Sequence, residues 1–198
     1  MTAIFNTDAA ILLWIQDVVR QPWLNPIMVF ITHLGDKGLL WILLTLGLTI
    51  PRKTRRVGVT SMISMTLGLI VANLILKNWV ARIRPYELID GLTLMVKKAH
   101  DFSFPSGHTT NSFAAGWVMF RGLKKRWGVP ALIMAILISL SRLYVGIHYP
   151  TDVLAGVVIG LCAAESARAI VAALRKRFPA FRRFIRPNKK NKRKRTSA

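Results

Sequence analysis

Cysteine and acidic residues are both scarce in this chain of 198 residues. Cys162 is the only cysteine, which excludes an internal disulfide bond and a thiolate metal cluster. Only 8 residues are Asp or Glu, against 29 Lys and Arg, so the formal net charge is +21. The N-terminus also lacks the basic start and small-residue cleavage site of a secretory signal. We therefore expect any membrane insertion to depend on segments that the chain retains.

Hydrophobic residues make up 53% of the chain, which is too apolar for a soluble domain with this net charge. The two properties are compatible if apolar and basic residues are segregated along the sequence. Of the Lys and Arg residues, 13 lie from Arg168 onward, and they end in the run from Lys189 to Arg195. Beside long apolar segments, such a run is more typical of a juxtamembrane segment that binds anionic lipid than of a nucleic-acid arm.

Apolar stretches long enough to cross or line a membrane alternate with polar connections. They are residues 26–50, 57–76, 106–120, 129–147 and 151–174. The first contains Gly35-Asp36-Lys37-Gly38, and charges in mid-membrane are costly, so we expect a break buried in protein or two short helices meeting there. A shorter stretch, residues 7–20, starts at a Thr7 or Asp8 cap and suits a helix lying in the membrane interface.

These patterns predict an all-α polytopic membrane bundle of five to six helices. Residues 1–56 would hold the interfacial helix and the first, possibly broken, transmembrane segment. Residues 57–176 would form a core of four transmembrane helices. Residues 177–198 would be a basic cytoplasmic tail without fixed structure.

The distribution of cations predicts the orientation of the bundle. The connections 51–56 and 121–126 hold four cations each, and the basic C-terminal region follows the last span on the same side. The positive-inside rule makes this side cytoplasmic. The 77–105 loop and the 148–151 turn then lie on the non-cytoplasmic face, where the polar residues around them are expected to meet.

One group of these residues begins a helix. Ser106 is a favoured N-cap, Gly107 lets an oxyanion approach the backbone, and the first N–H groups of a helix bind anions. Alone, this pattern is more typical of a simple capped helix end than of an anion site. His108 in the first turn adds a titratable group.

A second group carries positive charge. Lys77 and Arg84 combine a compact ammonium group with a planar guanidinium that can donate two hydrogen bonds at once. This combination suits a phosphoryl group. The alternative is that such cations reach lipid headgroups, which fits Lys97, Lys98 and Arg82 better. Arg142, about six residues inside a predicted span, is expected to be functional because an unpaired guanidinium is costly there.

The third group is His148 and Asp152, four residues apart. If a helix begins at Pro150, Asp152 can fix the tautomer of His148 and raise its basicity, which suits a nucleophile. The alternatives are a capping Asp with a headgroup-binding His, or a metal site completed by His108. The neighbouring cations argue against the metal site because they would repel the ion.

Three motifs of the chain stand in order and are separated by predicted spans: Lys77-x6-Arg84-Pro85, Pro105-Ser106-Gly107-His108, and Ser141-Arg142-x5-His148-x3-Asp152. Together they resemble the signature motifs of the type 2 phosphatidic acid phosphatase superfamily, membrane lipid phosphatases related to vanadium haloperoxidases. The resemblance covers roughly residues 57–174 and leaves out the N-terminal 50 residues and the tail.

The resemblance implies a metal-independent phosphatase without a cofactor. His148 would attack phosphorus to give a phosphohistidine, oriented by Asp152, while His108 would protonate the leaving oxygen and then activate water. The substrate-binding residues would be Lys77, Arg84, Ser106, Gly107 and Arg142.

The predicted function is hydrolysis of a lipid phosphate or diphosphate at the outer face of the cell membrane. Undecaprenyl diphosphate, phosphatidylglycerol phosphate and phosphatidic acid all fit, and the partners would be this lipid and anionic lipids at the tail, with no nucleic acid. A transporter using the same cations without chemistry is the main alternative, although no internal repeat supports it. A third possibility is a membrane adaptor acting through Lys189–Arg195.

Overall fold

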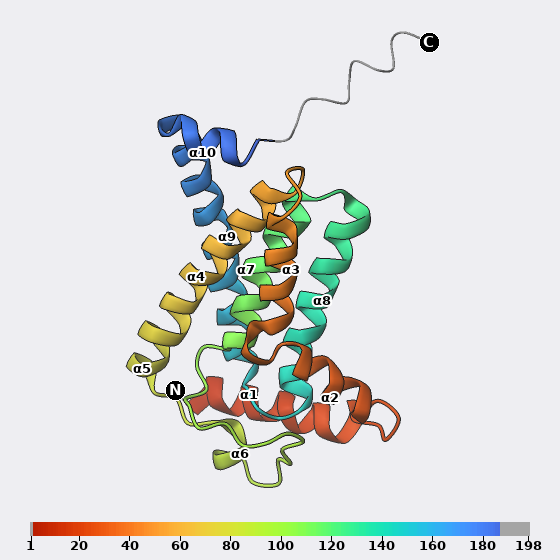
Figure 1. Cartoon of the computed structure of the whole chain (residues 1–198). Helices are drawn as coiled ribbons and strands as arrows, with labels where there is room; N and C mark the ends of the chain where they lie inside the picture. The colour runs from red at the N-terminus through yellow and green to blue at the C-terminus, as the bar shows by residue number, and fades with distance from the viewer. Residues whose placement is uncertain (1, 187–198) are drawn as a thin grey trace.

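The protein is a bundle of helices with two further helices lying across one end. The computed structural model describes residues 2–186, and all regular elements in this range are helical. Helices α3, α4, α7, α8 and α9 run side by side, whereas α1 and α2 lie across one end and α10 lies at the other (Figure 1). The bounds are α1 Thr2–Trp14, α2 Asn25–Leu34, α3 Leu39–Thr49, α4 Arg55–Leu69, α5 Lys77–Val80, α6 Pro85–Leu88, α7 Gly107–Gly122, α8 Lys125–Tyr144, α9 Pro150–Arg177 and α10 Pro179–Phe184.

Three helical segments are long and apolar enough to cross a membrane: Arg55–Leu88, Lys125–Tyr144 and Pro150–Arg177. A fourth crossing is possible if α2 and the segment Asp36–Thr49, which are bent by 45° at their junction, act as one broken span. The break predicted at Gly35–Gly38 therefore exists. It has the second of the two expected forms, two short helices that meet, because Asp36 and Lys37 are exposed there rather than buried. The prediction of an all-helical membrane protein is confirmed.

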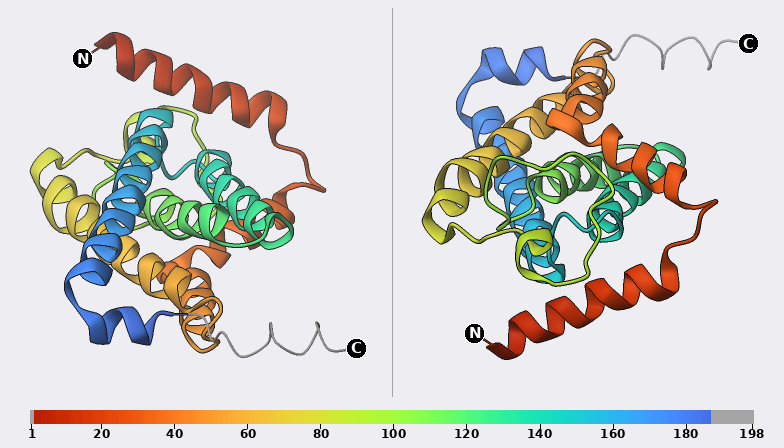
Figure 2. Two further views of the ribbon diagram at one scale, coloured as in Figure 1. Left: turned by 90° about the horizontal axis from the view of Figure 1, so that it is seen from above. Right: turned by 90° about the horizontal axis from the view of Figure 1, so that it is seen from below.

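Helix α7 is the centre of the bundle. Seen from either end, it is surrounded by α4, α8 and α9 (Figure 2). Its buried face is made of small residues, and Ala115 and Met119 join Trp41 and Ile138 in a fully buried cluster between α3, α7 and α8. The Trp41 indole donates a hydrogen bond to the Ser112 hydroxyl at 2.9 Å. Inside a membrane the hydrophobic effect does not drive helices together, because lipid tails are as apolar as the side chains. Small side chains and interhelical polar contacts of this kind instead allow the helices to pack closely.

The contact between α7 and α9 is close enough to require glycine. A Cβ built on Gly156 would lie 2.9 Å from the Ser106 carbonyl oxygen and 2.9 Å from the Thr109 Cβ. Gly156 lies one helical turn after Asp152, so this approach brings the start of α9 against the start of α7. Two of the predicted motifs are joined in this way.

Helix α1 differs from its prediction in both length and role. It begins at Thr2 and continues as a π-helical turn, Ile15–Val19, so neither Thr7 nor Asp8 is its cap. Asp8 is instead 2% exposed and points into the bundle end. Leu12 packs with Ile89, Leu92 and Tyr149 in a second buried cluster. The N-terminal segment is therefore part of the polar end of the molecule.

The predicted tail is also partly ordered. Residues 179–184 form α10, and Arg55 stacks on Phe184 with its guanidinium carbon 4.8 Å from the ring centroid. The expectation of a tail without fixed structure from residue 177 is wrong for this part. The run Lys189–Arg195 lies outside the described residues.

Candidate active site

All eight predicted site residues lie at the end of the bundle crossed by α1 and α2. Lys77 begins α5, Arg84 precedes α6, and Arg142 is in the last turn of α8. The loop between α6 and α7 passes over this end, as the view from below shows (Figure 2). The remaining site residues are Ser106, Gly107 and His108 at the start of α7, and His148 and Asp152 around the start of α9.

His148 and Asp152 form the pair that their spacing predicts. The His148 Nδ1 lies 3.5 Å from the Asp152 Oδ2, and the exposed fractions of the two residues are 2% and 0%. Ser103 reinforces the pair, because its hydroxyl donates to the same carboxylate oxygen and lies 3.5 Å from Nδ1. The Tyr149 N–H also donates to that oxygen at 3.0 Å. The helix cap of α9 thus holds the carboxylate in place.

The other imidazole nitrogen of His148 faces positive charge. Its Nε2 lies 3.5 Å from Nη1 of Arg84, and Nη1 is fixed by a hydrogen bond to the Ile147 carbonyl at 2.9 Å. Burial lowers the pKa of His148 to about 3, although the hydrogen bond to Asp152 acts in the opposite direction. The ring is therefore neutral at ordinary pH, with a lone pair on Nε2 beside a guanidinium.

Lys77 and Arg84 share one carboxylate. Asp101, in the loop before α7, lies 2.6 Å from the Lys77 Nζ and is also paired with Nη2 of Arg84. Burial raises the pKa of this carboxyl, but the bonds to the two cations outweigh burial and hold the pKa at about 2. The Asp101 side chain is 55% exposed, whereas the two cations are almost fully buried. A carboxylate thus occupies the position between the cations where a phosphoryl oxygen is predicted to bind.

Arg142 is buried without such a partner. It is 5% exposed and donates from Nη1 to the Thr32 hydroxyl of α2, while its Nε has no hydrogen-bond partner among the described residues. The sequence placed it about six residues inside a span, but α8 ends at Tyr144, so Arg142 is in the last turn. An orphaned buried N–H is costly, which indicates a group that awaits a ligand.

The start of α7 agrees with its prediction only in part. Ser106 is the N-cap, and its side chain accepts from the Thr109 N–H. The Ser106 N–H, however, donates to the Asp152 carbonyl at 3.1 Å, so it is not free for an anion as predicted. Gly107 and His108 are the first residues of the helix, where N–H groups have no intrahelical acceptor. The anion-binding capacity of this helix start rests on them.

His108 is held by a residue that the predicted site did not include. Its Nε2 lies 3.0 Å from the Oδ1 of Asp36, in the break between α2 and α3. The side chain of His108 is 22% exposed, so it is far more accessible than His148.

Arg82 is a second correction, because it does not reach toward lipid headgroups. It bridges Asp8 at 2.8 Å and Asp152 at 2.7 Å, and its guanidinium carbon lies 3.7 Å from the centroid of the Tyr149 ring. Arg82 thereby neutralises the carboxylate that orients His148. The only sequence signal for this was its position between two predicted binding residues.

Metal binding receives no support from this geometry. Within residues 2–186, no group of three or more His, Cys, Asp or Glu side chains is arranged to hold a metal ion. His108 and His148 contact different carboxylates, Asp36 and Asp152.

Comparison with known families agrees with the three motifs and with their meeting at one end of the bundle. A model of the PAP2 superfamily matches residues 58–176. The chain belongs to this superfamily. The match begins after α3, so it leaves out α1, α2 and the break that supplies Asp36.

Two of the relatives that match this chain are named as lipid phosphatases. The chain is 36% identical over 138 residues to an undecaprenyl-diphosphatase of Sulfolobus acidocaldarius, covering 69% of this chain and 66% of the relative. It is 35% identical over 157 residues to phosphatidylglycerophosphatase B of Bacillus subtilis, covering 73% of each. The prediction of a membrane phosphatase of this superfamily is confirmed.

Solved structures extend the likeness to nearly the whole chain. A phosphatidylglycerolphosphate phosphatase from Bacillus subtilis superposes with a TM-score of 0.72 at 30% identity, covering 88% of this chain and 89% of that one. LpxE from Aquifex aeolicus gives the same TM-score at 27% identity, with coverage of 81% and 93%. The arrangement of helices is therefore that of membrane PAP2 phosphatases.

Proposed function

We propose that this protein hydrolyses a lipid phosphate or diphosphate through a phosphohistidine formed on His148. The observation that carries the proposal is the environment of this buried, neutral imidazole. Its Nδ1 side contacts Asp152 and Ser103, and its Nε2 side faces Arg84. A nucleophile needs a free lone pair aimed at the group it attacks, and a phosphoryl group needs cations around it.

In the first step, Nε2 of His148 forms a bond to phosphorus while the bond from phosphorus to the leaving oxygen breaks. Positive charge then develops on the imidazole, and Asp152 stabilises it through Nδ1. Arg82 and the Tyr149 N–H hold Asp152 in place. His108 donates a proton to the leaving oxygen, takes one from water in the second step, and so returns His148 to its free form.

The cations would bind the phosphoryl oxygens during both steps. Lys77 and Arg84 share the single carboxylate of Asp101, and Arg142 contacts only a hydroxyl among its described hydrogen-bond partners, so positive charge exceeds negative charge here. The exposed Asp101 side chain would be displaced when a phosphate enters. The N–H groups of Gly107 and His108 complete the anion site at the start of α7.

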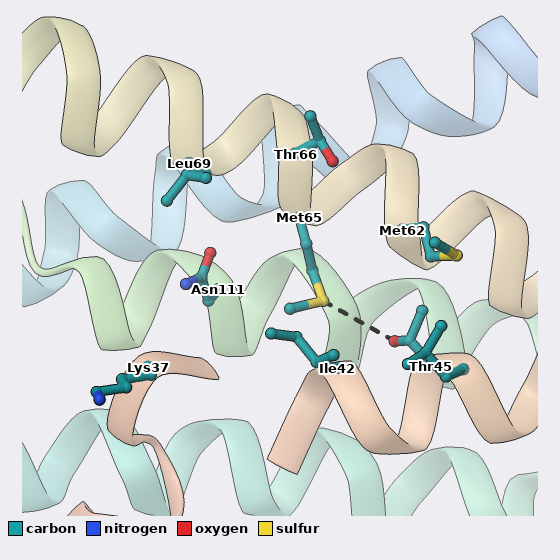
Figure 3. Close-up of a pocket in the computed structure, with 9 residues that line it drawn as sticks. Lys37, Ile42, Thr45, Met62, Met65, Thr66, Leu69 and Asn111 are labelled. Carbon is teal, nitrogen blue, oxygen red and sulfur yellow. Dashed lines mark hydrogen bonds between the residues drawn. The ribbon is translucent and has the colours of Figure 1, made fainter. Parts of the chain in front are cut away.

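A mostly apolar groove beside the site suits a lipid tail. It lies between α3 and α4, has a volume of about 220 Å³, and begins at Lys37 and Asn111 (Figure 3). Lys37 adjoins Asp36, and Asn111 lies one turn after His108 on α7. The groove continues along Ile42, Leu46 and Met62, where an acyl or prenyl chain would leave the polar end for the bilayer.

The substrate class follows from the relatives and from this groove. Relatives named as undecaprenyl-diphosphatases and as a phosphatidylglycerophosphatase support a diphosphate and a monophosphate substrate respectively. Both substrates join a phosphoryl group to a long apolar chain, which is what the site and the groove require.

Phosphate release in detergent with EDTA tests the function directly. Purified protein should hydrolyse undecaprenyl diphosphate, phosphatidylglycerol phosphate or phosphatidic acid, and His148→Ala should lower kcat by at least about 10³-fold because the nucleophile is gone. Rapid acid-free quenching of the wild type should trap a phosphoprotein that is stable to alkali and labile to acid. Hydrolysis that survives in His148→Ala, or that needs added metal, would contradict the mechanism.

We also propose that the site faces the outside of the cell and that the far end is cytoplasmic, from the distribution of cations. A cysteine at His100, in a background where Cys162 is replaced by Ala, should react with an impermeant thiol reagent on intact cells. A cysteine at Lys124 should react only after lysis. The opposite pattern would invert the orientation.

A further inference from the structure

The break between α2 and α3 brings a carboxylate to His108. Asp36 lies between two imidazoles: its Oδ1 is 3.0 Å from Nε2 of His108, and its Oδ2 is 2.8 Å from Nδ1 of His33. His33 belongs to α2 and Asp36 to the short turn after it. Both lie outside the region matched by the superfamily model, residues 58–176. A segment outside the matched region therefore contacts His108, a residue of the second motif.

The backbone at this break is fitted to the His108 ring. A Cβ built on Gly35 would lie 2.6 Å from His108 Cδ2 and 2.9 Å from Ile138 Cγ2, so only glycine allows the two segments to come this close. Lys37 and Gly38 both have positive φ, at 53° and 68°, which turns the chain sharply after Asp36. The Cδ2–Nε2 edge of the ring thus faces the break, and Nδ1 lies on the opposite edge.

We propose that Asp36 is a positioning residue for His108, fixing its tautomer with the proton on Nε2 and leaving Nδ1 to exchange a proton with the substrate. His33 in turn fixes Asp36 by binding the second carboxylate oxygen. The proposal rests on the proposed function, because it assigns His108 to proton transfer. It adds a second histidine–carboxylate pair, supplied by a different part of the chain from that of His148 and Asp152.

The proton transfers balance with Asp36 ionised throughout. In the first step, Nδ1–H of the His108 imidazolium gives its proton to the leaving oxygen as the phosphorus–oxygen bond breaks. In the second step, the neutral Nδ1 takes a proton from the attacking water as the bond from phosphorus to His148 breaks. Nε2–H donates to Asp36 in both states, so the carboxylate supports the positive charge that His108 carries between turnovers.

The surroundings of His108 make such support necessary. Burial lowers the pKa of His108, and the nearby cations Arg142 and Lys77 lower it further. Asp36 is the carboxylate that contacts the ring, and it acts against these two cations. Removal of Asp36 should therefore weaken proton donation more than phosphate binding.

The dependence of the rate on the leaving group distinguishes positioning from a structural role. Asp36→Asn should lower kcat/KM for an alkyl lipid phosphate such as phosphatidic acid by about 10²-fold, since an alkoxide leaves only with a proton. For 4-nitrophenyl phosphate, whose phenolate leaves unaided, the loss should stay below about threefold. The value of kcat/KM covers the steps up to transfer of the phosphoryl group, so later water attack does not mask the difference.

Glu165→Gln is the matched control. Glu165 is a half-exposed carboxylate that also has two hydrogen-bond partners, Trp117 and Arg168, but it lies far along α9 from the site. This variant should leave both kcat/KM values unchanged. Asp36→Glu, which keeps the charge, should recover part of the loss for phosphatidic acid.

A second pair of variants tests the same contact through the backbone. Gly35→Ala places a methyl group against His108 and should reproduce the dependence on the leaving group, whereas a Cβ at Gly47 meets nothing within 4 Å, so Gly47→Ala should be silent. Equal losses for both substrates in Asp36→Asn, or a gain in activity, would overturn the proposal. If the wild type itself hydrolyses neither substrate, the proposed function fails rather than this inference.

Discussion

The two ends of the bundle carry cations of the same kind in opposite surroundings. At the site end, Lys77, Arg84 and Arg142 are each less than 10% exposed. At the far end, Arg52, Arg121 and Lys124 are exposed. Carboxylates divide in the same way. Asp36, Asp101 and Asp152 contact site residues and Asp8 contacts Arg82, whereas within residues 2–186 the ion pair toward the far end is that between Arg168 and Glu165.

Burial, rather than the number of charges, distinguishes the site end from the solvated far end. An exposed cation is hydrated and screened, so it contributes little to binding any one anion. A buried cation has lost its water and needs a partner at a fixed position. Asp101 supplies such a partner to Lys77 and Arg84, whereas Arg142 has only the Thr32 hydroxyl among its described hydrogen-bond partners.

Arg142 should show the largest contrast between the two ends. Arg142→Ala removes a buried guanidinium with a free N–H, and we expect kcat/KM for a lipid phosphate to fall by about 10² to 10³-fold. Arg121→Ala, at the exposed end of α7, should change it by less than about twofold. Steady-state assays of both variants in one detergent test this, and similar losses in the two would remove the distinction.

Asp101 should show that a site carboxylate competes with phosphate. Asp101→Asn keeps the shape of the side chain but leaves Lys77 and Arg84 without their shared charge. Inhibition by inorganic phosphate should therefore strengthen by about tenfold, because the ligand no longer displaces a carboxylate. A weaker or unchanged inhibition constant would mean that Asp101 instead holds Arg84 in its binding position.

Acid should destabilise the protein through His148 at the site end. The pKa of His148 is about 3 in the folded protein and about 6.5 in an unfolded chain, so the unfolded state binds more protons between these values. Stability is fully present above pH 6.5 and is lost as pH falls below it.

Thermal unfolding in detergent between pH 7 and pH 4 measures this effect. The midpoint should fall with pH in the wild type and should fall less in His148→Asn, which has no group to titrate at that position. Equal slopes in the two proteins would assign the acid sensitivity to other groups.

The smallest effect is expected from the far end itself. Deleting residues 187–198 removes the last basic run, which lies outside the described residues, and should leave kcat/KM in detergent within about twofold. Binding to vesicles containing anionic lipid should weaken, since each Lys or Arg near such a surface adds about 1 kcal/mol. Loss of phosphatase activity on this deletion would instead connect the tail to the site.

From the sequence alone, the all-helical membrane bundle and the site residues of the three motifs could be predicted, whereas the start of α1 and the helix α10 could not. His148 and Asp152 could be paired from their spacing, because a helix that begins at Pro150 turns the Asp152 side chain back toward the residues just before it. Asp101 and Asp36 could not be placed, since a loop and a helix break bring them to the site, and Asp8 could not be placed because it depends on how α1 lies across the bundle end. The odd charge of Asp36 within an apolar stretch was visible, but its partner, His108, lies 72 residues away.

The contact between Asp8 and the start of α9 has a consequence for biosynthesis. Asp8 accepts hydrogen bonds from both the backbone and the hydroxyl of Thr151, which is synthesised 143 residues later. Asp8 is therefore synthesised long before Thr151. The contact between them can form only after the helix that begins at Pro150 has been made and inserted. Chains that stop before this span would lack Asp152, so His148 would have no carboxylate to orient it and the site would be incomplete.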